Sequence, residues 1–422
     1  KMTTSTGTST GTSTGSSIEK VMDKRERLLL ILTLGALTAL GPLAIDLYLP
    51  AMPAIASSMG EPLSRIQYTL SAYTLGFAIS QLVYGPLSDR FGRLTVMFPG
   101  IIFFALTSLL AAFCTTATQL IIVRVLQSFS AAAIMVTIPA MIRDLFPIEQ
   151  VARALSSIIL VMTVAPLAAP LLGGQILKFY GWQSLFIFLA VAAVLSMILA
   201  FFRVKETLAD EDRLVIPPVQ LALNYANILR NREALGCILC HAFFFGGMFA
   251  FIAGSPFIYI ELFNIPVEQY GLLFAVNILA MSMTNMVNIR LIGQFPLFTI
   301  LRGGSLIAAV SALILLFNAV TGFGGLPGLM IPVACYIACI GFTGPNSNAL
   351  ALSHFPKSAG SANALAGALR FTIAGITSAL VGYLHDGTAI PMAAIMAGCG
   401  LLSVAALALT RSSGEIEEPA VI

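Results

Sequence analysis

The feature that most constrains this chain is a succession of long apolar runs, separated by charge clusters or by glycine and proline. About 20 apolar residues in a helix cross a bilayer, and a helix satisfies its own backbone polar groups in lipid. The runs predict spanning helices at 28–49, 66–84, 95–114, 119–141, 152–176, 183–203, 234–260, 269–291, 298–318, 326–350, 360–383 and 389–410. We therefore expect an all-α membrane protein with twelve transmembrane helices.

The composition agrees with a lipid environment. Hydrophobic residues make up 58% of the chain and charged residues 10%, whereas a soluble domain has about 25% charged residues. The net charge of +3 is too small to indicate a nucleic-acid partner. The six cysteines all lie in apolar runs, so we expect no disulfide framework and interpret them as small core residues.

A polar, charged stretch at 204–233 divides the spans into six and six, which predicts two six-helix bundles joined by a linker. The Thr/Ser/Gly repeat near the start cannot bury apolar surface, so it predicts a disordered tail. The charged run before the first span resembles a signal peptide, but that span is too long, and we expect it to be retained. The predicted units are a tail at 1–27, an N-terminal bundle at 28–203, the linker at 204–233, a C-terminal bundle at 234–410 and a tail at 411–422.

The basic residues predict the orientation. Eighteen of the 22 Lys and Arg residues fall in the tails and in the connections on one side of the membrane. Arg65 and Lys178 alone fall on the opposite side, while Arg124 and Arg370 lie within spans. Because cytoplasmic loops carry an excess of Lys and Arg, we expect both termini to be cytoplasmic.

Asp46 is the most informative single residue, because an ionisable side chain inside a span usually faces a partner or an aqueous cavity. Arg124 is its candidate partner. Helix rise places Asp46 about 5 Å and Arg124 about 8 Å below the same membrane face. A nearby arginine favours an ionised carboxyl and burial favours a neutral one, so the pair suits a proton switch. The alternative is a static ion pair that only fixes helix packing.

The nine residues Gly85-Pro-Leu-Ser-Asp-Arg-Phe-Gly-Arg93 lie between two spans, and we expect a tight loop on a membrane face. In it Gly85 lets one helix end or bend closely against a neighbour, Asp89 can cap a helix N-terminus, and Arg90 and Arg93 stay in water or headgroups. Gly92 belongs to the same motif. An ordinary basic turn would explain the arginines but not the glycines and the aspartate. The order G-x-L-x-D-R-x-G-R resembles the signature loop between the second and third helices of the major facilitator superfamily.

Further segments strengthen the resemblance. Arg124-Val-Leu-Gln127-Ser is similar to the fourth-helix motif R-x-x-Q-G of that family. Ala-Pro170-Leu-Leu-Gly173-Gly174 resembles its antiporter motif, G-P-x-x-G-G, which is associated with exporters; the alternative is a generic small-residue packing face. The segment from Ala44 to Pro53 looks like the first-helix end of the Bcr/CflA group of drug/proton antiporters, in which the aspartate is the expected protonation site.

Polar and aromatic side chains within the spans are candidates for substrate binding. Arg370 lies about 15 Å into the eleventh span, near the midplane, where it faces a cavity or is satisfied by backbone carbonyls. Asn277 either lines that cavity or joins helices by hydrogen bonds. The candidate substrate-binding residues are Tyr73, Gln127, Phe249, Asn277, Asn346 and Arg370.

The resemblance implies a proton-coupled antiporter of the bacterial inner membrane. Such a protein exports drug-like molecules of the bicyclomycin or chloramphenicol type by alternating access. We expect a monomer that needs no metal or cofactor and uses the proton as coupling ion. The alternatives are a proton-linked metabolite transporter, working in either direction, and a membrane sensor that transports nothing.

An enzyme is not expected, because the three histidines are scattered and no residues have catalytic spacing. Cys237-Ile-Leu-Cys240-His241 matches the haem-attachment pattern C-x-x-C-H. Since this segment opens the cytoplasmic end of an apolar span, and haem attachment needs the oxidising side, we expect no haem.

Overall fold

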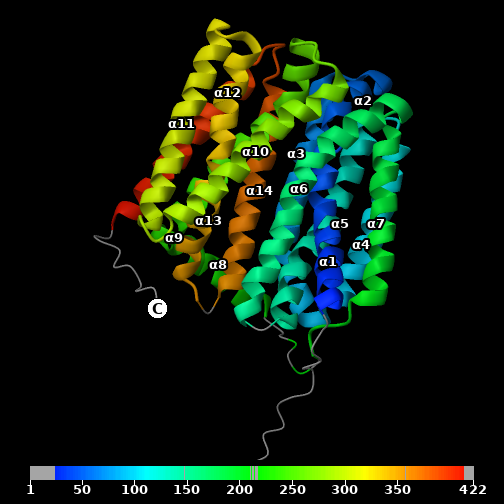
Figure 1. Ribbon diagram of the computed structural model, residues 1–422, viewed down its shortest axis with the longest axis vertical. Helices are drawn as coiled ribbons and strands as arrows, with labels where there is room; N and C mark the ends of the chain where they lie inside the picture. The colour runs from blue at the N-terminus through cyan, green and yellow to red at the C-terminus, as the bar shows by residue number, and fades with distance from the viewer. Residues whose placement is uncertain are drawn as a thin grey trace, which may run out of the picture.

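The computed structural model describes residues 24–146, 148–209, 211, 213, 217–356 and 358–412. Most of the two predicted tails therefore lies outside the described residues. The described part is a set of long helices that run mainly along the longest axis of the molecule, and it contains no β-strand (Figure 1). The first and second halves of the chain form two helical bundles side by side, which confirms the predicted fold class.

The elements follow the predicted spans closely. The first half contains α1 (Lys24–Asp46), η1 (Leu49–Ala51), α2 (Met52–Met59), α3 (Leu63–Phe91), α4 (Arg93–Ala112), α5 (Ala117–Leu145), α6 (Ile148–Tyr180) and α7 (Gln183–Arg203). The connecting segment contains α8 (Pro218–Arg230). The second half contains α9 (Arg232–Pro256), η3 (Phe257–Leu262), α10 (Val267–Leu291), α11 (Leu297–Thr321), α12 (Gly325–Ala338), α13 (Ile340–Ser353), α14 (Ala359–Tyr383), α15 (Ile390–Ala406) and η4 (Leu407–Ser412).

Eleven helical segments of the described chain are long and apolar enough to cross a membrane. Helix α3 is the twelfth, and its 29 residues are long enough as well. It packs between α5 and α14, where Gln67, Thr74 and Ser80 are buried against protein. Its polar residues therefore need not face lipid, which explains why α3 is less apolar than the other spanning helices. The chain is a multi-pass membrane protein.

The predicted first span is interrupted. Helix α1 ends at Asp46, and the short η1 turn leads into α2. Pro50 and Pro53 lack the N–H that would continue the helical hydrogen bonds, which favours a break here. Asp46 is consequently the last residue of its helix.

We call the end of the bundles that holds the α3–α4 turn and α8 the linker face, and the end that holds α2 the far face (Figure 1). At the linker face the prediction of a loop at 85–93 is wrong. Helix α3 continues through Pro86 to Phe91, and Gly92 alone, at a φ of 99°, makes the turn into α4. A side chain at Gly85 would meet nothing within 4 Å, so that glycine is not needed for close packing.

The prediction that Asp89 caps a helix is also wrong, because Asp89 precedes the turn and lies inside α3. The free N–H groups at the start of α4 follow the turn. Glu206 of the connecting segment accepts hydrogen bonds from the backbone N–H groups of Arg93, at 2.9 Å, and Leu94, at 3.0 Å. Arg93 is not in water but 6% exposed, donating to Asp89 and, at 3.0 Å, to Asp144. Only Arg90 has the expected exposed side chain.

Helix α8 joins the two halves at the linker face. Its Tyr225 hydroxyl donates to the Leu82 carbonyl of α3 at 3.2 Å. In a helix the Leu82 carbonyl would accept from the N–H of residue 86, but residue 86 is proline and has no N–H. The connecting segment therefore supplies a hydrogen bond that α3 cannot make for itself, and it holds α8 against the N-terminal bundle.

Candidate functional site

A cavity of about 250 Å³ lies between the two bundles. Its walls are mainly phenylalanine, methionine and isoleucine side chains of both halves. Of the described residues that line it, Asp46 alone carries a carboxyl group. The lining residues are Gly41, Pro42, Ile45, Asp46, Tyr73, Phe77, Met135, Met162, Pro166, Phe245, Met248, Phe249, Phe251, Ile252, Phe274, Asn277, Ile278, Met281, Ile337, Ile340 and Phe371.

Asp46 stands at the C-terminal end of α1 and is 5% exposed. Its carboxyl group faces the protein cavity and not lipid. Within the described chain it has no ion pair with any basic side chain. Because a buried charge without a partner is costly, this position suits a carboxyl that gains and loses a proton.

Arg124 of α5 is fully buried, with 0% exposure. Its guanidinium lies 4.5 Å from the centre of the Tyr48 ring and 4.3 Å from that of Tyr73. Its Nη1 donates to Gln127 Oε1 at 2.5 Å, and Gln127 Nε2 donates to Ser108 Oγ at 2.7 Å. In the described part of the chain, its Nε and Nη2 have no hydrogen-bond partner.

The direct pair expected between Asp46 and Arg124 is therefore not formed in this structure. Two tyrosine rings contact the guanidinium instead. Tyr73 lines the cavity beside Asp46 and lies within electrostatic reach of both charges. The depth calculation from sequence could not give the direction in which each side chain points around its helix. The proton-coupling role of both residues stays a prediction.

The structure places half of the predicted substrate-binding residues on the cavity. Tyr73, Phe249 and Asn277 line it, and the Nδ2 of Asn277 is buried without a hydrogen-bond partner in the described chain. Gln127 and Asn346 do not belong to the described lining. Asn346 Nδ2 donates to Asn288 Oδ1 at 2.8 Å, which joins α13 to α10.

Sequence reasoning missed most of the aromatic lining. The Phe371 ring of α14 lies 4.6 Å from Phe77 of α3 and 5.3 Å from Phe245 of α9, measured between ring centres. These contacts form an apolar wall across the two bundles. The sequence carries no sign of it, because a phenylalanine in a span faces lipid as readily as a cavity.

The predicted motif residues on α6 lie at close helix contacts. A Cβ on Gly173 would lie 2.0 Å from the carbonyl oxygen of Leu47. A Cβ on Gly174 would lie 2.7 Å from the carbonyl oxygen of Val267 in the other bundle. Helix α6 continues through Pro170. The glycine pair thus lets the end of α1 and the start of α10 approach the α6 backbone.

Further contacts close the far face between α6 and α10. Lys178 and Glu268 form an ion pair at 2.9 Å. A Cβ on Gly271 would lie 2.6 Å from the backbone nitrogen of Leu171. Because backbone atoms cannot move aside cheaply, this closed arrangement requires glycine at position 271.

We expect Gly271→Ala to open the far face. Overpacking costs about 1–3 kcal/mol, so a cysteine placed at Ile45, in a variant without other cysteines, should react about tenfold faster with an impermeant thiol reagent from that side. Gly303→Ala is the control, since a Cβ there meets nothing within 4 Å. Equal labelling rates in the two variants would contradict this role for the contact.

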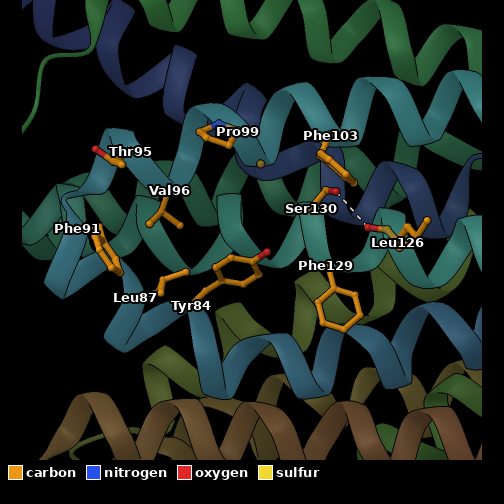
Figure 2. Close-up of a pocket in the computed structure, with 11 residues that line it drawn as sticks. Tyr84, Leu87, Phe91, Thr95, Val96, Pro99, Phe103, Leu126, Phe129 and Ser130 are labelled. Atoms are coloured by element: carbon orange, nitrogen blue, oxygen red, sulfur yellow. Dashed lines mark hydrogen bonds between the residues drawn. The ribbon is translucent and has the colours of Figure 1, made fainter. Parts of the chain in front are cut away.

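A larger hollow of about 490 Å³ lies on the N-terminal bundle alone, between α3, α4 and α5 (Figure 2). Phe91, Phe103 and Leu126 are exposed there, and Ser130 donates to the Leu126 carbonyl at 3.1 Å. No charged residue of the described chain lines it. Since it involves one bundle and lacks a titrating carboxyl, we take the central cavity as the candidate site.

Known proteins show which family this chain belongs to. The profile of the Major Facilitator Superfamily matches residues 34–379. The chain is 34% identical to the "Bicyclomycin resistance protein homolog" of Haemophilus influenzae, over 91% of this chain and 96% of that protein. It is 26% identical to the "Chloramphenicol resistance protein" of Pseudomonas aeruginosa, over 86% of each.

A solved structure supports the fold. A bacterial homolog of the human lysosomal transporter Spinster, in an inward-facing and unoccupied conformation, superposes with a TM-score of 0.68. The match covers 92% of this chain and 95% of that one, at 15% identity. At that identity the likeness concerns the fold alone.

Proposed function

Because this chain belongs to the Major Facilitator Superfamily, we propose that it is an antiporter that exports drug-like small molecules in exchange for protons. Members of this family are transporters and not enzymes. Bicyclomycin-type and chloramphenicol-type antibiotics are the proposed substrates, since the similar proteins are named for resistance to them. The apolar cavity with one carboxyl, shared by both bundles, is the observation that carries the proposal.

The linker face is cytoplasmic in this proposal, and the membrane is the bacterial inner membrane. The excess of Lys and Arg on that side of the chain supports the orientation. The far face, which Lys178, Glu268 and Gly271 close in this structure, then points to the outside.

Transport proceeds by rocking of the two bundles about the cavity. Asp46 takes a proton when the far face is open and releases it when the linker face is open, where the drug enters. One proton that moves down about 100 mV and one pH unit releases about 3.7 kcal/mol. Each 1.4 kcal/mol supports about a tenfold concentration ratio, so this energy suffices to export a neutral solute against a gradient of several hundredfold.

Proteoliposomes that contain the purified protein test this function. Chloramphenicol should cross the membrane toward the more acidic side, and the flux should reverse when the pH gradient is reversed. Flux of a metabolite but not of chloramphenicol, in the direction of the protons, would favour the proton-linked metabolite transporter. No solute flux under either gradient would favour a sensor.

A further inference from the structure

A further charge within the spanning helices lies outside the surroundings of Asp46 and Arg124. Arg370 occupies the middle of α14, directly before the cavity residue Phe371. In the described chain its guanidinium takes part in no ion pair, and its Nε is buried without a hydrogen-bond partner. Since a guanidinium keeps its charge in a protein, the buried Nε–H is left without the acceptor that it would need.

His241 of α9 lies beside this cation. It is 5% exposed, and its Nδ1 is buried without a partner in the described chain. Arg370 is a charged group within electrostatic reach of it. Helices α9 and α14 pack against each other, and each carries one buried nitrogen without a partner in the described chain. No oxygen of the described residues accepts from the Arg370 guanidinium. Leaving such groups unsatisfied costs about 1–3 kcal/mol each, and more for a charged group.

The imidazole is connected to the cavity. Gly344 of α13 packs closely against it, since a Cβ there would lie 3.3 Å from His241 Cε1. The His241 ring is 6.0 Å from Phe245, which itself contacts Phe371. Both phenylalanines line the central cavity, so the two polar side chains adjoin its linker-face end.

We propose that Arg370 and His241 form a subsite for an anionic oxygen group, such as a carboxylate, of a substrate whose apolar part occupies the central cavity. The inference rests on the proposed function, since it names a class of its substrates. The anion would accept from the guanidinium, and the apolar part would contact Phe245 and Phe371. Neutral drugs would occupy the same cavity without using this subsite.

A matched pair of ligands tests the subsite: dansyl-phenylalanine and its methyl ester, which differ in the negative charge. Binding to the full chain in lipid nanodiscs is measured by dansyl fluorescence. Wild-type protein should bind the acid about tenfold more tightly than the ester, which equals about 1.4 kcal/mol. Arg370→Gln should remove this preference with little effect on the ester. Arg302→Gln, an exposed arginine of α11, is the control and should keep it.

Equal affinity of wild-type protein for acid and ester would overturn the proposal, even if the Arg370→Gln protein does not fold. Equal weakening of both ligands in Arg370→Gln would also overturn it, since that indicates a structural role. Arg370→Lys keeps the charge without the planar donors and should retain part of the preference. Chloramphenicol flux separates the two proposals. A preference for the acid without chloramphenicol flux would support the subsite and refute the proposed export. Chloramphenicol flux without a preference for the acid would refute the subsite alone.

Discussion

Asp46→Asn protein is expected to bind drug but to lose all proton-driven accumulation. Asparagine has nearly the same shape as aspartate but cannot carry a proton on and off, so the coupling energy of about 3.7 kcal/mol is no longer available. Chloramphenicol should then only equilibrate across the proteoliposome membrane. At about tenfold per 1.4 kcal/mol, the limiting ratio of its concentrations on the two sides should fall several hundredfold. Drug-driven proton movement, followed with a pH-sensitive dye, should disappear as well.

The structure supplies a matched control for this variant. Asp386 is an exposed carboxyl beyond α14, where it accepts from Thr388. Asp386→Asn should leave accumulation unchanged. Undiminished accumulation in Asp46→Asn would refute Asp46 as the proton carrier. The described lining of the cavity contains no second carboxyl that could replace it.

Arg124→Gln is expected to cause a large loss of stability. The buried guanidinium lies over two tyrosine rings, and a desolvated cation–π contact is worth about 2 kcal/mol. Its removal also takes a donor from Gln127. We expect a loss of about 2–4 kcal/mol, from the two ring contacts and from the buried Gln127 oxygen that is left without its donor.

Thermal unfolding of the protein in detergent, with drug flux on the fraction that stays folded, measures this change. Arg124→Lys keeps the charge, but an ammonium group cannot stack flat on Tyr48 and Tyr73 together. It should therefore recover only part of the stability. A lysine protein as stable as wild type would show that charge alone, and not the planar contact with the rings, matters at this position.

The linker face shows where sequence reasoning succeeded and where it failed. The motif at 85–93 predicted a loop between two spans; two helices do meet there, but Gly92 alone makes the turn. The partners of this turn were not predictable, because Glu206 lies more than a hundred residues from the N–H groups that it caps. Arg93 was expected in water for a similar reason: its acceptor Asp144 comes from the end of α5, and only the folded chain brings the two together.

The cavity repeats this contrast. Asp46, Tyr73, Phe249 and Asn277 could be named from residue type and depth, and they line it. Gln127 and Asn346 fit the same criteria but hydrogen-bond inside their own bundles. Residue type and depth do not fix the direction of a side chain around its helix, so sequence could not separate the two groups.

The sequence by itself determined the spans, since a backbone in lipid must satisfy its own hydrogen bonds as a helix, and only a long run of apolar side chains lets a helix lie in lipid. It also determined that two charges would lie inside the N-terminal half. The tertiary structure alone decided that Arg124 lies against Tyr48 and Tyr73, and that Asp46 faces the shared cavity. The physical reason is helix packing: the angle at which each helix turns toward its neighbours depends on contacts between distant segments.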